Sequence, residues 1–263
     1  MITIRSSEEL ARLERASRVV LETLDVLGRA VAPGVTTEEL DRIAAEEIRR
    51  RNAKPAFLNY RGFPKTICTS VNDEVVHGIP GNRSLKEGDI VGIDCGAIVD
   101  GYYGDAARTL PVGRIDGTRR KLLDVTREAL EIGIAAARPG GRVSDIGAAV
   151  EAVAVAHGYG VVREFVGHGV GTALHEEPQV PNYGPAGRGS TLKPGMVLAI
   201  EPMFNLGGGD VRVDKDGWTV RTRDASASAH FEYTIAIVPA GSVVLGTGRI
   251  GAIGTREAAA VPA

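Results

Sequence analysis

Two acidic side chains stand directly after long apolar runs that are predicted to be buried strands. Asp94 follows Ile90-Val91-Gly92-Ile93, Glu201 follows Met196-Val197-Leu198-Ala199-Ile200, and no Lys or Arg flanks either acid. An isolated ionised carboxylate taken out of water is so costly that it normally neutralises, pairs with a cation or binds a metal. Three further side chains that can bind metal lie in or beside apolar runs: Asp105, His168 and Glu232. Four carboxylates and one imidazole in such settings indicate a dinuclear metal centre.

The position of Asp105 relative to Asp94 follows from a hairpin signal between them. Asp100-Gly101 lies between two apolar, β-prone stretches, which predicts a two-residue hairpin turn. With that turn, position 94 faces position 107, and Asp105 is the diagonal neighbour of Asp94 on the same face. Such neighbours are about 7–8 Å apart at the backbone, and two buried acids there repel unless a cation lies between them. The alternative, in which Asp105 is simply a turn residue, stays open at this point.

The ligand types restrict the choice of metal. Oxygen-rich sites with one imidazole suit Mn, Fe or Co better than ions that select thiolates, and they leave Zn open. Four carboxylates carry four negative charges, which two divalent cations balance. Because paired ions about 3.5–4 Å apart serve hydrolysis by activating a bridging water, the sequence predicts hydrolytic chemistry at a two-metal site.

Three of the five histidines lie in settings that suggest function: His77, His168 and His175. The clearest setting is Gly167-His168-Gly169-Val170-Gly171, where small neighbours let the backbone approach another group closely. A lone histidine is more often structural than a ligand, so both interpretations remain open. His157 reads as the last turn of a helix before a glycine stop, and His230 is left unassigned.

Several strings of this sequence resemble those of type I methionine aminopeptidases. The matching strings are Val71-Asn72-Asp73-Glu74-Val75-Val76-His77-Gly78-Ile79-Pro80, Ile93-Asp94 with Gly104-Asp105, Gly167-His168-Gly169-Val170-Gly171 through His175-Glu176-Glu177-Pro178, and Glu201-Pro202-Met203. The resemblance extends from about Ser6 to Pro239, and all five ligand positions match in order and context. It implies a metal-dependent aminopeptidase that removes the initiator methionine from nascent polypeptides and prefers a small second residue.

The resemblance also implies a role for each site residue. The metal ligands would be Asp94, Asp105, His168, Glu201 and Glu232, with Asp105 and Glu232 bridging both ions. Glu201 would also serve as general acid/base. His175 would stabilise the scissile amide as charge develops, and His77 would help in proton transfer or orientation, so that both contact the substrate. The attacking group would be a hydroxide that bridges the metals.

An aromatic cluster predicts the pocket for the substrate side chain. Aromatic residues make up only 5% of the chain, yet Phe57, Tyr60 and Phe63 lie close together and Cys68 follows them. From the residues alone, a small satellite core is the alternative. The resemblance assigns Tyr60, Phe63, Cys68 and Trp218 to the methionine pocket, with Phe57 beside them. A thioether is a good partner for aromatic rings and a thiol.

Two positions depart from the common family pattern. Glu232 is followed by Tyr233, where many relatives have a histidine, and Leu174 stands where an aromatic residue often precedes the histidine matched by His175. These changes put the surroundings of the ligands in question, but not the five ligands. The sequence also leaves open which divalent ion is used, whether turnover needs one or two, and whether a monovalent cation binds near Asn72.

The first half of the chain carries two helix signals followed by strand signals. A capping box over Ser6 to Glu9 begins a helix. Its apolar residues recur at helical spacing: Leu10, Leu13, Ala16, Val20, Leu24 and Leu27. A second helix is expected to begin at Thr36 or Thr37, with Glu39 as its capping partner, and strands over residues 66–110.

The same order then restarts. A helix is expected near residues 118–137, a further helix capped by Ser144, and strands over 161–238. The spacing from Pro33-Gly34 to Leu40 equals that from Pro139-Gly140 to Ile146. We therefore expect two helix-helix-strand halves related by a pseudo-twofold axis around a central antiparallel sheet, and the resemblance implies the same α/β (α+β) architecture, the pita-bread fold.

Length and composition agree with one catalytic domain over residues 1–263, since single cores tend to split beyond about 250–300 residues. We expect its core over about 6–239 and a tail over about 241–263 that is at most partly ordered. No run of about 18 apolar residues and no signal peptide is evident. Cys68 and Cys95 give no disulfide framework, which fits a reducing cytoplasm.

A net charge of -2 argues against a general nucleic-acid binder. The exception is Arg49-Arg50-Arg51 with Lys54, at the end of a predicted helix. Such clusters usually complement the helix dipole in solvent, and a ribosome contact is the alternative, since the family trims nascent chains. Nothing in the sequence demands more than a monomer.

Three rival functions are separable on sequence features. Proline-specific peptidases share the fold and ligands, but they usually carry a large additional N-terminal domain. Type II methionine aminopeptidases generally contain an inserted helical subdomain between the positions matched by Glu201 and Glu232, where this chain has only 30 residues. Non-catalytic fold relatives have lost ligands, whereas all five are present here.

Overall fold

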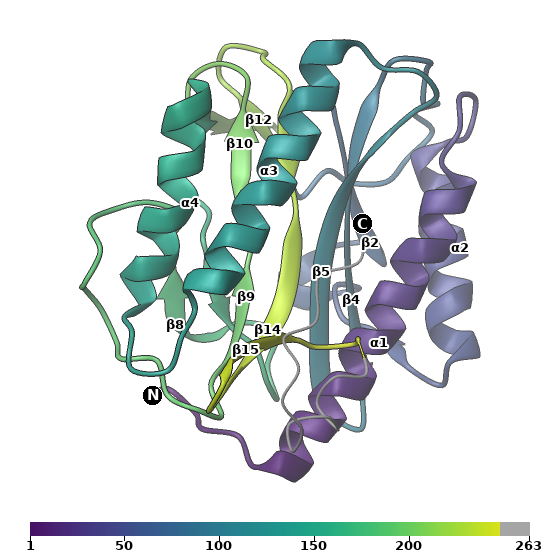
Figure 1. The fold of residues 1–263 in the computed structure, drawn as a ribbon. Helices are drawn as coiled ribbons and strands as arrows, with labels where there is room; N and C mark the ends of the chain where they lie inside the picture. The colour runs from purple at the N-terminus through teal and green to yellow at the C-terminus, as the bar shows by residue number, and fades with distance from the viewer. Residues whose placement is uncertain (248–263) are drawn as a thin grey trace.

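The computed structural model describes residues 1–247. Its helices are α1 (Ser7–Ala30), α2 (Thr37–Arg50), α3 (Gly117–Ala136), α4 (Val143–His157) and the short 3-10 helix η1 (Tyr60–Gly62). Figure 1 shows them as two pairs over a sheet, α1 with α2 and α3 with α4. This is the predicted pita-bread architecture of paired helices around a curled antiparallel sheet.

The central sheet contains nine strands: β1 (Lys54–Pro55), β2 (Ile67–Val71), β4 (Ile90–Val99), β5 (Tyr102–Pro111), β7 (Gly167–Gly169), β8 (Glu176–Val180), β9 (Val197–Ile200), β14 (Glu232–Val238) and β15 (Gly241–Val244). Their order is β1-β4-β5-β14-β9-β7-β8, with β2 on β4 and β15 on β14, and the pairings are antiparallel. The centre of the sheet is the contact of β5 with β14, where the two halves of the chain meet.

Six short strands form two smaller sheets: β3 (Glu74–Val76), β6 (Gly160–Val161), β10 (Met203–Asn205), β11 (Val211–Val213), β12 (Val220–Thr222) and β13 (Ser228–His230). Their orders are β13-β10-β6 and β11-β12-β3. Each small sheet joins segments from distant parts of the sequence, so these two sheets depend on the tertiary fold.

The predicted first helix is confirmed. The Ser6 hydroxyl accepts from the backbone N–H of Glu9, and the Glu9 carboxylate accepts from the N–H of Ser6, which closes the capping box. The six apolar residues at helical spacing are all buried. The predicted start of α2 is confirmed as well, with Thr36 as its N-cap.

The predicted cap of the fourth helix is wrong. The N-cap of α4 is Arg142, whose backbone N–H donates to the Asp145 carboxylate at 2.7 Å. The Ser144 hydroxyl instead accepts from the N–H of Arg188 at 2.7 Å. Because α4 begins at Val143, Ser144 lies inside the first turn and its hydroxyl meets the facing loop, while Asp145 closes the helix end. The predicted end of the helix at His157, before Gly158, is confirmed.

The repeated spacing corresponds to repeated hydrogen bonds. Gly34 donates to the carbonyl of Leu85 at 2.8 Å, and Gly140 donates to that of Leu192 at 2.9 Å. Two isolated bridges show the same correspondence, Thr36 with Ser84 and Arg142 with Thr191. In each half, the turn between the two helices is thus tied to the segment that leads into a central strand.

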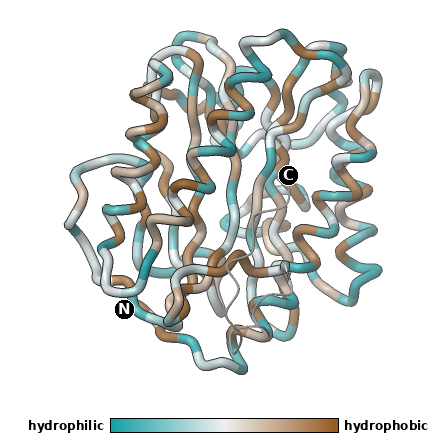
Figure 2. The backbone as a smooth tube through the Cα atoms, viewed as in Figure 1, coloured by the Kyte–Doolittle hydropathy of each residue, from teal (hydrophilic) through white to brown (hydrophobic). Residues whose placement is uncertain are grey.

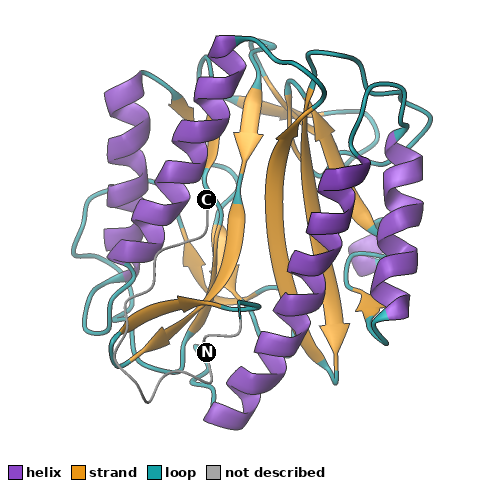
Figure 3. Ribbon diagram, turned by 45° about the vertical axis from the view of Figure 1, so that its right-hand side comes forward, coloured by secondary structure: helices purple, strands orange, loops and turns teal. Residues whose placement is uncertain are grey.

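The two faces of the central sheet differ in character. Ile93, Cys95 and Ala97 of β4 pack with α1 and α2 in one apolar cluster, so the alternation of the strand leaves Asp94 on the opposite face. Figure 3 shows the helices gathered against the strands. Apolar and polar residues alternate along these helices in Figure 2, as on amphipathic helices that cover a sheet.

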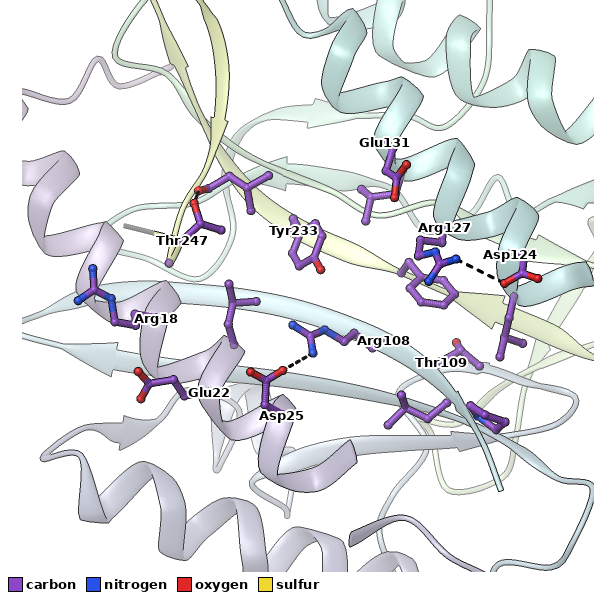
Figure 4. Close-up of a pocket in the computed structure, with 18 of the residues that line it drawn as sticks. Arg18, Glu22, Asp25, Arg108, Thr109, Asp124, Arg127, Glu131, Tyr233 and Thr247 are labelled. Atoms are coloured by element: carbon purple, nitrogen blue, oxygen red, sulfur yellow. Dashed lines mark hydrogen bonds and ion pairs between the residues drawn. The ribbon is translucent and has the colours of Figure 1, made fainter. Parts of the chain in front are cut away.

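On the helical side, a hollow of about 820 Å³ lies between α1, β5, α3 and β14 (Figure 4). Its ion pairs join Arg108 to Asp25 at 2.6 Å and Arg127 to Asp124 at 3.5 Å. None of the predicted site residues lines it. Tyr233 does, so this departure from the family pattern projects into the hollow on the helical side (Figure 4).

The predicted tail begins inside the sheet, because β15 pairs with β14 from Gly241 to Val244. The rest of that prediction, residues 248–263, lies outside the described residues. Among residues 1–247, no helix combines the length and apolarity that crossing a bilayer requires.

Candidate active site

The first two acids lie on one hairpin, in the predicted register. Asp94 of β4 pairs with Ala107 of β5, and Gly96 pairs with Asp105. The turn residues Asp100 and Gly101 both have positive φ, 49° and 80°, as a two-residue hairpin turn of this class requires. Asp105 lies inside a strand, so the alternative that made it a turn residue is wrong.

The other two acids come from neighbouring strands that are distant in sequence. Glu201 directly follows β9, Glu232 begins β14, and the pairing of Tyr233 with Ile200 places them side by side. The contact of β14 with β5 then brings them against the first hairpin, since Glu232 pairs with Ala107.

His168 reaches the same place from β7, which pairs with β9. It stands between two glycines that allow very close approach of other backbone. A Cβ at Gly167 would lie 2.3 Å from the carbonyl oxygen of Ala199, and one at Gly169 would lie 2.3 Å from that of Glu177. The glycine-rich setting therefore allows tight strand packing around a histidine whose side chain faces the site.

All twelve residues predicted for the site line one cavity of about 310 Å³: Phe57, Tyr60, Phe63, Cys68, His77, Asp94, Asp105, His168, His175, Glu201, Trp218 and Glu232. They come from both halves of the chain, so the cavity exists only in the folded molecule.

The carboxylates and His168 are arranged as a cation site. His168 Nε2 lies 3.5 Å from Glu201 Oε1 and 3.8 Å from Asp105 Oδ2. Ligand atoms of Asp105, His168 and Glu232 all lie within 4.8 Å of one another. Within residues 1–247, three buried oxygens of this group have no hydrogen-bond partner: Asp94 Oδ1, Asp105 Oδ1 and Glu232 Oε1. Buried acceptors without donors, held this close, fit divalent metal.

Burial and mutual repulsion raise the pKa values of the four acids. Burial raises the pKa of Asp94 to about 7. Burial, followed by the charges of Glu232 and Asp94, raises the pKa of Asp105 well above its usual value. Burial is the first cause for Glu201 and Glu232 as well, followed by the neighbouring carboxylates, and both pKa values are raised. A bound cation would reverse this balance, because metal ligands must be deprotonated.

The histidines around the acids are held neutral. Burial lowers the pKa of His168 to about 3 and that of His77 to about 4, and the nearby His175 adds to both shifts. Near neutral pH, His168 therefore has an unprotonated ring nitrogen, which is the form that binds metal.

His175 lies at the mouth of the cavity, and its ring contacts that of Tyr60. The Tyr60 hydroxyl and His175 Nδ1 are 2.8 Å apart, and the two rings are stacked. Burial, followed by the charge of Arg61, lowers the pKa of His175. If the tyrosine donates to Nδ1 of the neutral ring, the proton of the imidazole is on Nε2 and is free to be donated to a bound molecule.

An apolar pocket adjoins the acids. Phe57, Phe63, Cys68 and Leu174 are buried in one cluster against which Trp218 packs, and the Phe63 and Trp218 rings meet edge to face at 5.2 Å. Burial, followed by the charge of Asp94, raises the pKa of the Cys68 thiol, which therefore stays protonated. Leu174, the other departure from the family pattern, thus forms part of the pocket wall.

Sequence reasoning missed His230 and Phe165. His230 is buried, and its Nε2 lies 3.7 Å from Glu201 Oε2. A signal existed, because residues 230 and 232 share one face of an extended chain. Phe165, whose ring meets His77 edge to face at 5.4 Å, belongs to no strand, so no periodicity pointed to it.

Comparison with known proteins agrees with this geometry. The profile of metallopeptidase family M24 matches residues 11–239. Methionine aminopeptidase 1 of Bacillus subtilis is 50% identical over 245 residues, which are 93% of this chain and 99% of that protein. The crystal structure of methionine aminopeptidase from Rickettsia prowazekii superposes with a TM-score of 0.92 at 45% identity, covering 94% of this chain and 100% of that one.

A proline-specific relative is more distant. Prolidase from Pyrococcus furiosus is 24% identical with a TM-score of 0.74, and the match covers 93% of this chain and 65% of that one. This likeness reflects the shared fold alone. The chain belongs to metallopeptidase family M24 and, within it, to the methionine aminopeptidases, hydrolases that remove the initiator methionine from polypeptides.

Proposed function

We propose that the five predicted ligands hold two divalent cations and that the surrounding side chains direct hydrolysis of the first peptide bond. The residues that would hold them are Asp94, Asp105, His168, Glu201 and Glu232. The observation that carries the proposal is the group of buried carboxylate oxygens without partners in the described chain. Four carboxylates match the charge of two divalent ions, with Mn, Fe, Co and Zn as candidates.

When bound, such ions would supply a more acidic water and polarise the carbonyl that is attacked. Glu201 is suited to accept and return a proton during the attack, because its carboxylate lines the cavity and lies 3.5 Å from His168 and 3.7 Å from His230. The free amino group of the substrate would lie against the same carboxylates, which explains the restriction to the first residue.

His175 would donate its Nε2 proton to the carbonyl oxygen as negative charge develops there. Its contact with Tyr60 supports this role, since it leaves the donor nitrogen directed away from the tyrosine. His77, between the rings of Phe165 and Trp218, would orient the amide at the other side of the cavity.

The apolar pocket would hold the methionine side chain between Tyr60, Phe63 and Trp218, beside Cys68. Aromatic rings and a thiol are favourable surroundings for a thioether. A small second residue would be preferred, because the chain beyond the first bond passes close to the metal-binding wall. Cleavage of a Met-X peptide series at equal rates for bulky and small X would overturn this preference.

For the rest, we propose a single catalytic domain that acts as a monomer in the cytoplasm on nascent chains. A ribosome contact at Arg49-Arg50-Arg51 and Lys54 has less support, because two of these arginines already pair with glutamates at this helix end. Arg50 and Arg51 both pair with Glu47, and Arg51 also pairs with Glu22 at 2.7 Å. Charge reversal of the cluster in a ribosome pelleting assay tests the contact. A monovalent cation near Asn72 likewise stays a prediction.

The test of the proposed site is release of methionine from a Met-Ala-Ser peptide. Metal-depleted protein is resupplied in turn with Co, Mn, Fe and Zn, and Glu201→Ala is compared with Glu128→Ala, an exposed control on α3. We expect metal-restored release that Glu201→Ala abolishes and Glu128→Ala leaves intact. Undiminished release by folded Glu201→Ala protein would contradict the assignment.

A further inference from the structure

We propose that Arg5 is a positioning residue for His175, acting through Glu176 and the turn over residues 171–176. The inference rests on the role proposed above for His175. Arg5 belongs to the segment before α1, far in sequence from the site, and it does not line the cavity. Its guanidinium nevertheless contacts the turn that carries His175, the proposed donor to the carbonyl oxygen.

The Arg5 side chain is buried and held on three sides. It is only 5% exposed, and its Nη2 donates to both carboxylate oxygens of Glu176, at 2.7 and 2.5 Å. Nη1 donates to Glu9 at 3.2 Å, and the backbone N–H of Arg5 donates to the carbonyl of Gly195 at 2.8 Å. The capping box of α1 therefore has a second use, because Glu9 both starts the helix and fixes the arginine.

Glu176 in turn closes the loop that presents its neighbour His175. One carboxylate oxygen accepts from the backbone N–H groups of Thr172 and Ala173, at 2.9 and 3.1 Å. A Cβ at Gly171 would lie 1.8 Å from Arg5 Nη2 and 2.5 Å from Glu176 Oε1. Only a glycine lets the charged groups pack this closely, so loop and arginine are fitted to each other.

This linkage matters because the turn over residues 171–176 carries His175. The residue is exposed at the cavity mouth, and its side-chain hydrogen bond within residues 1–247 goes to Tyr60 of η1. The centre of its ring lies 4.2 Å from that of the His168 ring. These contacts depend on the position of residues 171–176, because that turn carries the histidine. A buried arginine that loses its partner, or a carboxylate left unpaired, forces such a loop to rearrange. Misplacement of a catalytic group by about 1 Å can cost on the order of 100-fold in rate.

The first test measures kcat and KM of metal-loaded enzyme on Met-Ala-Ser. We expect Arg5→Ala and Glu176→Gln to lower kcat by about 10- to 100-fold with KM changed less than about threefold, since His175 acts on charge that develops only in the transition state. Arg5→Lys should recover part of the loss, because one charged donor remains. Arg42→Ala, which removes an exposed pair with Glu46 on α2, is the matched control and should change neither constant.

A double-mutant cycle separates positioning from a merely structural role. In a His175→Ala background, Arg5→Ala should lower kcat no further, because its effect passes through His175. Equal losses in both backgrounds, or full kcat in folded Arg5→Ala and Glu176→Gln proteins, would overturn this inference alone. A His175→Ala enzyme with wild-type kcat would overturn the role proposed for His175 and this inference with it. If Arg5→Ala does not fold, Glu176→Gln carries the same cycle.

Discussion

The two halves of this aminopeptidase supply the same kind of strand pair by different routes. In the first half, Asp94 and Asp105 lie on β4 and β5, which a two-residue turn connects. In the second half, Glu201 and Glu232 lie at β9 and β14, which pair directly but are joined by residues 202–231. That long connection contains the strands β10 to β13 and carries Trp218 and His230 to the cavity.

The flanking strands extend the comparison. β2 pairs with β4 and places Cys68 opposite Asp94, whereas β7 pairs with β9 and brings His168 to the acids. In corresponding positions, one half provides the Cys68 thiol and the other the His168 imidazole beside the acids. Equivalent strands of a repeated fold can thus carry side chains with different chemical functions. The first half supplies two acids on one hairpin and most of the apolar pocket, while the second half supplies two acids, His168 and His175, together with Trp218.

The largest loss of activity is expected when one acid is removed from either half. Asp94→Asn and Glu201→Gln should each lower kcat/KM on Met-Ala-Ser by at least about 10³-fold, since both would lose a ligand of a site worth several kcal/mol of transition-state stabilisation. Metal content, measured on the same preparations, should fall as well. If either variant kept its metal and full activity, the two halves would not contribute alike.

The second prediction concerns stability without metal. The pKa of buried Asp94 is about 7, against 3.8 for an exposed aspartate, so the unfolded chain binds fewer protons between these values. Stability should therefore fall as pH rises through this window. Asp94→Asn should make the metal-free protein more stable by a few kcal/mol at about pH 8 and by little near pH 4. Urea unfolding at both pH values measures it, and a less stable variant at pH 8 would refute the argument.

A smaller effect is expected at the pocket wall that the second half contributes. Trp218→Ala should raise KM for Met-Ala-Ser by about 10- to 100-fold, which corresponds to the burial of one large apolar side chain, with kcat changed less than about threefold. Leu58→Ala is the control, because Leu58 is a large apolar residue that is 41% exposed and does not line the cavity. If Trp218→Ala lowered kcat alone, the indole would act at the reacting atoms and not in the side-chain pocket.

The smallest effect is expected on stability, when a glycine is replaced in one turn of each half. Gly101, between β4 and β5, and Gly217, between β11 and β12, have φ values of 80° and 78°, and an added Cβ at either meets nothing within 4 Å. Alanine at either position should therefore cost about 1 kcal/mol of stability from backbone strain alone. Urea unfolding measures both. A much larger loss at Gly101 would mean that the first hairpin depends on its turn more than the second half does.

Much of the fold was predictable because its signals are local. The register that sets Asp94 beside Asp105 follows from a turn dipeptide and a period of two, and the buried face of α1 follows from helical spacing. The predicted Ser144 cap was wrong for a local reason as well, since the helix begins one residue earlier, at Val143, and Asp145 closes its end. His230 was missed because an unassigned histidine gains meaning only from the neighbours that the fold brings to it.

By itself the sequence determined the elements, the first hairpin and the chemical types that a metal centre needs, because these depend on residues within one turn or one strand pair. The tertiary structure alone decided that Glu201, Glu232 and His168 meet that hairpin, through the contact of β14 with β5 and of β9 with β7. It also decided that Arg5 pairs with Glu176, the neighbour of His175 in the chain. Contacts between segments so far apart leave no periodic trace in the chain, since their free energy comes from burial that only the completed fold provides.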